Sequence, residues 1–185
     1  MRVITGSARG RKLNELKGRD TRPTTDRVKE GMFNIIQFDI EGRRALDLFA
    51  GTGQMGIEAL SRGAAFCTFV DLRKEAAAVV RENLAHTRLA DNARVIQGDY
   101  LAFLTGCREK FDLVFLDPPY NTGMLEKALE TIAKIDIMTE NGIIVCESPA
   151  EAALPELEAP YVGGREYRYG KIKLTLYHRA SGNRM

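Results

Sequence analysis

Residues 117–120, Asp117-Pro118-Pro119-Tyr120, directly follow the apolar run 111–116 and have the clearest chemical potential in the chain. Neither proline can donate a backbone N–H, so a strand before them must end here in a rigid tip. The tip presents one carboxylate, several carbonyl oxygens and an aromatic ring. These groups suit a flat base whose exocyclic amine donates hydrogen bonds. The simpler interpretation is a strand end and a proline turn, with Asp117 as the turn former.

Hydrophobic periodicity and helix breakers divide the chain into alternating strands and helices. Helices are predicted over 25–38, 55–61, 74–85, 102–104 and 124–133, and strands over 45–49, 66–70, 94–96, 113–116 and 143–146. The tail 163–177 has Tyr169-Gly170 between two strand-like stretches, which is typical of an antiparallel hairpin. This pattern predicts an α/β fold, with a mostly parallel sheet covered by helices on both faces.

Four successive predicted strands end in an aspartate, namely Asp47, Asp71, Asp99 and Asp117. The carboxyl ends of parallel strands lie at one edge of a sheet, and ligands of open α/β sheets bind in the crevice there. A single aspartate at such a position is commonly a turn residue or a helix cap. Four in succession predict a crevice that is surrounded by carboxylates.

The glycine-rich segment 51–56 matches Gly-x-Gly-x-x-Gly, and Asp71 lies twenty residues after Gly51. Taken literally, this spacing indicates a nicotinamide dinucleotide. The carboxylates of Asp47 and Asp117 would repel the pyrophosphate of that cofactor, whereas they would attract the sulfonium and ammonium of S-adenosylmethionine. We therefore expect S-adenosylmethionine to be the ligand.

Each carboxylate of the crevice has an expected partner on this cofactor. Asp47 would anchor the amino-acid end, directly or through water, and Asp71 would accept hydrogen bonds from the ribose diol. Asp99 would accept from the adenine amine, with Tyr100 nearby.

With this cofactor, the tip at 117–120 suits methylation of a nucleobase amine. Asp117 and the carbonyl oxygen of Pro118 would accept the two amine hydrogens and aim the nitrogen at the methyl carbon. Asp117 would also stabilise the positive charge that develops on the nitrogen. Tyr120 would stack on the base, which must be turned out of its own stack. We do not expect Asp117 to remove the proton before transfer.

Charge is distributed unevenly, although the net charge is only +2. Residues 1–31 and residues 161–185 each carry +5, which leaves −8 for the middle of the chain. Two basic ends on an acidic body suggest a polyanionic partner. The three cysteines are widely spaced, and neither a membrane-length apolar stretch nor an apolar signal core is present, so we expect a cytoplasmic protein without membrane segments. The two histidines lack metal-ligand spacing, and we expect no metal.

Together these residues resemble the class I S-adenosylmethionine-dependent methyltransferases and, more narrowly, the RsmD family of small-subunit ribosomal RNA guanine-N2 methyltransferases. The likeness covers nearly the whole chain. Its main segments are Arg22-Pro23-Thr24-Thr25-Asp26-Arg27 with the helix that follows, Leu46-Asp47-Leu48-Phe49-Ala50-Gly51-Thr52-Gly53, Asp117-Pro118-Pro119-Tyr120 and Tyr169-Gly170. Gln54 and Met55, where relatives often carry small or apolar residues, are a mild departure.

The resemblance implies a Rossmann-like class I methyltransferase fold, with a mostly parallel seven-stranded sheet and an antiparallel C-terminal hairpin strand. The implied substrate is a guanine of 16S ribosomal RNA, in the 30S subunit or an assembly intermediate, and we expect a monomer. Residues 25–185 would form one catalytic domain, and residues 1–24 a basic extension that contacts RNA outside the core.

Two sets of contacts follow from this resemblance. The cofactor would contact Asp47, Phe49, Ala50, Gly51, Thr52, Gly53, Gly56, Asp71, Leu72, Asp99, Tyr100 and Asp117. RNA would contact Arg9, Arg11, Lys12, Arg19, Arg22, Thr24, Arg27 and Lys171, with Lys173 extending the same surface. Contacts with phosphates give an affinity that depends on salt concentration but does not distinguish one base from another. The resemblance also implies that Arg22-Pro23-Thr24 lies across the cofactor crevice. A plain helix entry, with Thr24 or Thr25 as the cap, is compatible with this position.

Three alternatives stay open. An N6-adenine methyltransferase that acts on DNA or RNA shares the Asp-Pro-Pro-Tyr tetrad, although the 24 residues before the predicted catalytic domain are few for a separate DNA-reading domain. A protein-glutamine methyltransferase would more often carry Asn at position 117. A non-catalytic RNA-binding ribosome assembly factor would have no need of the intact tetrad.

Overall fold

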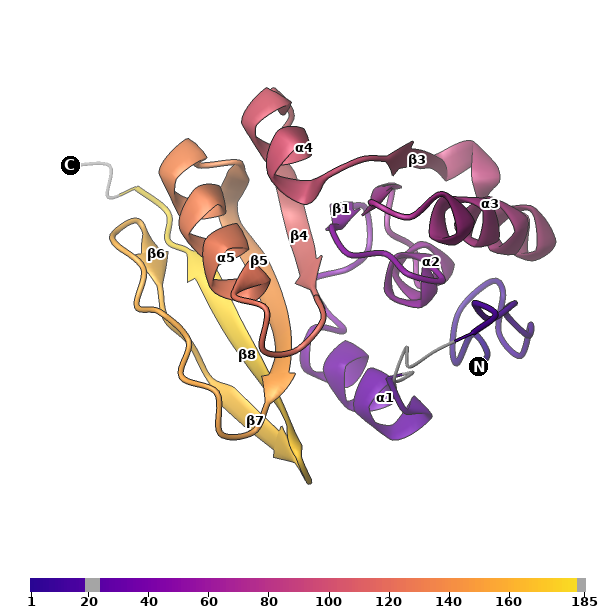
Figure 1. Ribbon diagram of the computed structural model, residues 1–185, viewed down its shortest axis with the longest axis horizontal. Coiled ribbons are helices and arrows are strands. Elements are labelled where there is room, and N and C mark those ends of the chain that lie inside the picture. The colour runs from indigo at the N-terminus through magenta and orange to yellow at the C-terminus, as the bar shows by residue number, and fades with distance from the viewer. Residues whose placement is uncertain (19–23, 183–185) are drawn as a thin grey trace.

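The computed structural model describes residues 1–18 and 24–182, and Figure 1 shows a sheet with helices packed against it. The parallel strands are β1 (Arg44–Asp47), β2 (Phe66–Asp71), β3 (Ala93–Gln97), β4 (Phe111–Leu116) and β5 (Met138–Pro149). The antiparallel strands are β6 (Tyr161–Val162), β7 (Glu166–Tyr169) and β8 (Ile172–Arg179). In the order β3-β2-β1-β4-β5-β8, the chain changes direction across the sheet between β1 and β4. Ligands of such sheets bind at this switch point.

The helices cover both faces of the sheet. They are α1 (Asp26–Ile35), α2 (Gln54–Ser61), α3 (Lys74–Thr87), α4 (Tyr100–Gly106) and α5 (Met124–Ile135), with a 3₁₀ turn η1 (Ala90–Asn92). Helices α1, α2 and α3 share one hydrophobic core with Phe115, while α4 and α5 share a second core with Val114. Adjacent residues of a strand point to opposite faces, which separates the two cores. No helix in the described part of the chain is long and apolar enough to cross a membrane.

The predicted Rossmann-like α/β sheet is confirmed, but the described residues form eight strands rather than seven. The extra strand arises because β6 and β7 lie along the same edge of β8, one at its end and one at its beginning. Gly164 separates them, and a Cβ there would lie 1.2 Å from the carbonyl oxygen of Leu176. This close backbone approach interrupts the ladder.

The first predicted helix, 25–38, is too long at its C-terminal end. Thr25 is its N-cap, and the Thr25 hydroxyl accepts a hydrogen bond from the backbone N–H of Val28. The helix stops at Ile35 because the N–H of Asp39 donates to the carbonyl of Ile36 and closes a turn instead.

The expectation that residues 1–24 lie outside the core is wrong for the part that the structure describes. Val3, Ala8 and Leu13 are all buried within the first core. The backbone N–H of Ala8 donates to the hydroxyl of Ser61 in α2 over 2.9 Å. Residues 1–18 therefore belong to the same folded unit as the helices and strands of the first core.

Candidate active site

The carboxyl ends of the strands surround a cavity of about 880 Å³. Asp47, Asp71, Asp99 and Asp117 all line this cavity, so the structure brings the four strand-end carboxylates together. The lining also includes, from the expected cofactor contacts, Phe49, Ala50, Gly51, Thr52, Leu72 and Tyr100. Gly53 and Gly56 lie behind the residues that line it.

Each of the three glycines in segment 51–56 is suited to its position for a different structural reason. Gly51 has φ of +57°, in the left-handed region that favours glycine. A Cβ there would meet no atom within 4 Å, so the space beside its backbone is free. Gly53 has φ of +82° and is the N-cap of α2. Gly56 packs α2 against β2, where a Cβ would come within 2.3 Å of the Phe69 ring. Its N–H donates to Asp47 Oδ2 over 3.0 Å, so Gly56 supports the cavity wall from behind.

Asp47 is buried, with 4% of the residue exposed. Burial, opposed by the hydrogen bond from Gly56 and assisted by the charge of Asp71, raises the pKa of Asp47 to about 7. A carboxyl group with this pKa changes charge near neutral pH. A cation in the cavity would favour the ionised form.

Asp71 holds the glycine loop that follows β1, and Asp99 begins α4, the helix that follows its own strand. Asp71 Oδ2 accepts a hydrogen bond from the N–H of Gly51 over 2.9 Å. Asp99 is the N-cap of α4 and accepts from two backbone N–H groups of its first turn. The helix-cap interpretation of Asp99 is therefore correct, alongside its place in the cavity. The rings of Tyr100 and Phe49 pack beside it, with their centroids 5.0 Å apart.

Asp117 follows β4, and its environment is acidic. Burial, and then the charges of Glu147 and Asp47, raise the pKa of Asp117 well above its usual range, while a hydrogen bond from Thr24 opposes them. The Thr24 hydroxyl lies 3.4 Å from Asp117 Oδ2. Thr24 itself is buried, and its hydroxyl points to Asp117 and Glu147, so Thr24 does not belong to an outer RNA-contacting surface.

Glu147 is a site residue that the sequence analysis missed. It lies in β5, lines the cavity and is 4% exposed. The Tyr120 hydroxyl donates to Glu147 Oε1 over 2.9 Å. The signal that could have found it is an acidic residue directly after the apolar run 143–146, in a strand expected near the strand that leads to Asp117.

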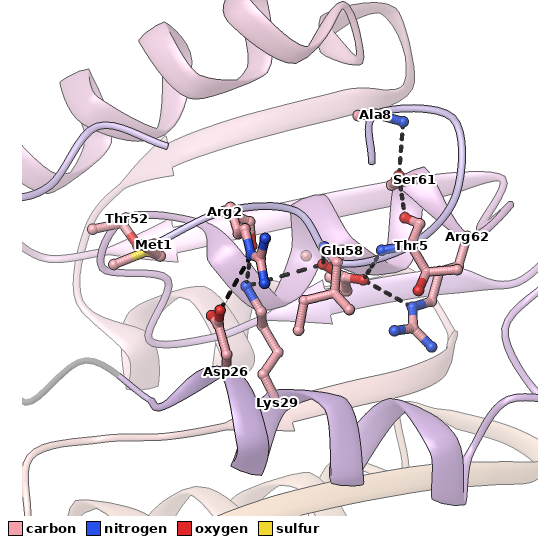
Figure 2. A network of polar contacts seen from close by, with 12 residues as sticks. Met1, Arg2, Thr5, Ala8, Asp26, Lys29, Thr52, Glu58, Ser61 and Arg62 are labelled. Atoms are coloured by element: carbon pink, nitrogen blue, oxygen red, sulfur yellow. Dashed lines mark hydrogen bonds and ion pairs between the residues drawn. The ribbon is translucent and has the colours of Figure 1, made fainter. Parts of the chain in front are cut away.

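The N-terminal segment also contributes to the cavity, which the sequence did not predict. Met1, Glu15 and Leu16 belong to its lining. Figure 2 shows how the segment is held in place, with the buried Glu58 of α2 at the centre of the contacts. Its carboxylate accepts from the backbone N–H groups of Ile4 and Thr5, forms an ion pair with Arg62 and lies 4.0 Å from Lys29 Nζ.

A second anchor joins this segment to the glycine loop. Asn83 of α3 is fully buried. Its side chain accepts from the N–H of Asn14 over 2.7 Å and donates to the carbonyl oxygen of Thr52 over 2.9 Å. Residues 15 and 16 of the cavity wall are therefore fixed relative to the glycine loop, which also lines the cavity.

The expected RNA contacts are in different environments. Arg9, Lys12, Arg27 and Lys171 are exposed, whereas Arg11 is partly buried and donates to the carbonyl oxygen of His86 over 2.6 Å. Arg19 and Arg22 lie outside the described residues. Lys173 does not extend this surface, because it is 3% exposed and its ammonium donates to Glu166 and to the carbonyl of Ala152.

The fold and the site together define the class, a Rossmann-like class I methyltransferase, because carboxylates line the switch point where a dinucleotide-binding sheet would receive phosphates. A family model described as "Conserved hypothetical protein 95" matches residues 1–178. The chain belongs to this family.

Two relatives and one solved structure illustrate the family. The candidate rRNA methyltransferase YlbH of Bacillus subtilis is 42% identical and covers 96% of this chain and 98% of its own length. Ribosomal RNA small subunit methyltransferase D of Escherichia coli is 37% identical, and the match covers 97% of this chain and 90% of that protein. The solved structure of the candidate methyltransferase yhhF of Escherichia coli matches with a TM-score of 0.89 at 35% identity. The match covers 98% of this chain and 99% of that structure. The resemblance predicted from the sequence is confirmed.

Proposed function

We propose that this chain transfers a methyl group from S-adenosylmethionine to the exocyclic N2 amine of a guanine in small-subunit ribosomal RNA. The observation that carries the proposal is that the rigid tip with Asp117 and Tyr120 shares one cavity with Asp47, Asp71 and Asp99. The groups that would accept the amine and those that would hold a cationic cofactor are thus adjacent. The relatives that are named as ribosomal RNA methyltransferases support the choice of substrate.

The residues of the cavity fit a cationic cofactor. Asp47 is a buried carboxylate, and the side-chain oxygen of Gln54 is buried without a hydrogen-bond partner in the described part of the chain. Both would accept from an ammonium group, and a pyrophosphate would be repelled. Asp71 would hold the ribose, and Asp99 with Tyr100 the adenine. When bound, S-adenosylmethionine would supply the electrophilic methyl carbon.

The residues of the chain would contribute to catalysis by orienting the amine and by stabilising the charge on its nitrogen. Asp117 and the Pro118 carbonyl would accept the two N–H groups of the amine and fix its direction, and positioning of this kind is a large catalytic term. The carboxylate would also stabilise the charge that develops on the nitrogen. Tyr120 would stack on the flipped base, which contributes about 1–3 kcal/mol.

The charge state of Asp47 predicts how cofactor binding depends on pH. Its pKa in the folded chain is about 7, and only the ionised form attracts an ammonium. Affinity for S-adenosylmethionine should therefore fall about tenfold between pH 8 and pH 6. Isothermal titration calorimetry across this range measures the effect, and Asp47→Asn should remove the pH dependence. An unchanged slope in that variant would assign the effect to another group.

RNA would be held by exposed basic residues near the N-terminus, with Arg27 and Lys171 adding to them. Arg11 is already engaged with a backbone carbonyl, so Arg9 and Lys12 are the cleaner pair to replace. Arg9→Ala with Lys12→Ala should weaken RNA binding and lower the slope of log affinity against log salt by about 1.5. Filter binding at several salt concentrations gives this slope. Lys127→Ala with Lys134→Ala, on α5, is the matched control, for which we expect an unchanged slope.

The proposed function is tested by mapping the product. The protein is incubated with labelled methyl donor and 30S particles from cells that lack it, and the modified nucleotide is located by mass spectrometry. N2-methylguanine in 16S RNA is the expected result. Label on the N6 amine of an adenine would replace the substrate assignment, and RNA binding without any label would favour an assembly factor.

A further inference from the structure

We propose that Glu147 is a positioning residue for methyl transfer, which holds the Tyr120 ring and the Thr24 hydroxyl in register with Asp117; this inference rests on the function proposed above. In the parallel pair of β4 and β5, Leu116 lies opposite Cys146. Asp117 and Glu147 are the next residues along these two neighbouring segments. The two acids therefore emerge side by side at the edge of the cavity.

Both oxygens of the Glu147 carboxylate are in contact with other parts of the site. Oε1 accepts from the Tyr120 hydroxyl over 2.9 Å, and Oε2 accepts from the Thr24 hydroxyl over 3.0 Å. The same Thr24 hydroxyl lies 3.4 Å from Asp117 Oδ2. One buried side chain thus links the ring that would stack on the base, the segment that enters α1 and the acceptor of the amine.

The charge of Glu147 acts on Asp117. Both carboxylates approach the Thr24 hydroxyl, and like charges this close repel each other. The groups that act on Asp117 are Glu147 from β5, Asp47 from β1 and Thr24 from the segment before α1. The first two are like charges that raise its pKa, and Thr24 donates and lowers it. Removal of the Glu147 charge must therefore make Asp117 easier to ionise.

Two variants separate the hydrogen bonds of Glu147 from its charge. Glu147→Gln keeps an oxygen that can accept from Tyr120 but removes the charge. With 30S particles as substrate, its acidic limb of kcat/KM should move about one pH unit lower, with KM within twofold of the wild type. Tyr120→Phe keeps the charge but releases the ring, and it should raise KM about fivefold without moving the limb.

A matched control and a measurement without substrate complete the test. Tyr161→Phe removes a similar bond, from the Tyr161 hydroxyl to Asp136 over 2.8 Å, outside the cavity lining, and should change neither readout. Titration of the Asp117 carboxyl by ¹³C NMR should show a lower pKa in Glu147→Gln whether or not RNA is methylated. An unchanged KM in Tyr120→Phe, or a wild-type titration of Asp117 in Glu147→Gln, would overturn the inference. Wild-type protein that transfers no methyl group would instead refute the proposed function.

Discussion

Asp117→Ala is expected to lower the rate of methyl transfer by roughly 10³-fold, because the variant loses both the acceptor that orients the amine and the charge that stabilises the product nitrogen. Affinity for the RNA should stay within about twofold, since phosphate contacts elsewhere supply most of it. Turnover is measured with labelled S-adenosylmethionine and 30S particles, and RNA affinity by filter binding.

The pKa of Asp117 allows this loss to be separated from unfolding. The folded chain raises that pKa well above its usual range, mainly through burial. The folded state therefore binds the proton more tightly than the unfolded state, and ionised Asp117 lowers stability once the pH exceeds the unfolded value. Asp117→Ala should be at least as stable as the wild type at pH 8, as measured by urea denaturation. Asp117→Asn, which keeps one oxygen acceptor, should lose less activity than the alanine variant.

A parallel loss of turnover and of RNA affinity would contradict this prediction. Such a result would mean that Asp117 supports the structure of the RNA-binding surface instead of acting on the amine. The double variant of Arg9 and Lys12 should show the opposite behaviour, with weaker binding of RNA and nearly normal turnover at saturating RNA.

The sheet and its acidic edge could be predicted because their signals are local. A strand buried on both faces reads as an apolar run, and a charged or proline residue marks its end. Asp47 and Asp117 each follow such a run directly. Parallel strands then bring these ends together without any further information. The position of the four aspartates therefore followed from the alternation of strands and helices.

The rest of the site depends on contacts between distant residues, which no local pattern encodes. Val3, Ala8 and Leu13 are spaced by five residues, which matches neither a helix nor a strand, yet all three are buried. Glu147 acts with Thr24, 123 positions before it. Only the packed structure reveals these partners.

The second large effect is expected on stability. Glu58→Ala should lower the free energy of unfolding by about 3–5 kcal/mol, because it leaves a buried cation without its counter-ion. Lys29 is fully buried, with Nζ 4.0 Å from Glu58, and two backbone N–H groups of the N-terminal segment lose their acceptor as well (Figure 2). Urea denaturation gives the difference. Glu30→Ala, at an exposed position of α1, is the control and should stay within about 0.5 kcal/mol.

The pH dependence of this variant identifies the source of its instability. Burial lowers the pKa of Lys29, and the charge of Glu58 raises it. Without Glu58 the folded chain releases the lysine proton more readily than the unfolded chain does, so its stability rises with pH. The difference between Glu58→Ala and the wild type should therefore shrink between pH 7 and pH 9. An equal difference at both values would mean that the lost hydrogen bonds of Ile4 and Thr5, rather than the buried charge, cause the instability. In either case, affinity for S-adenosylmethionine should fall, because the segment that Glu58 holds carries Met1, Glu15 and Leu16 into the cavity wall.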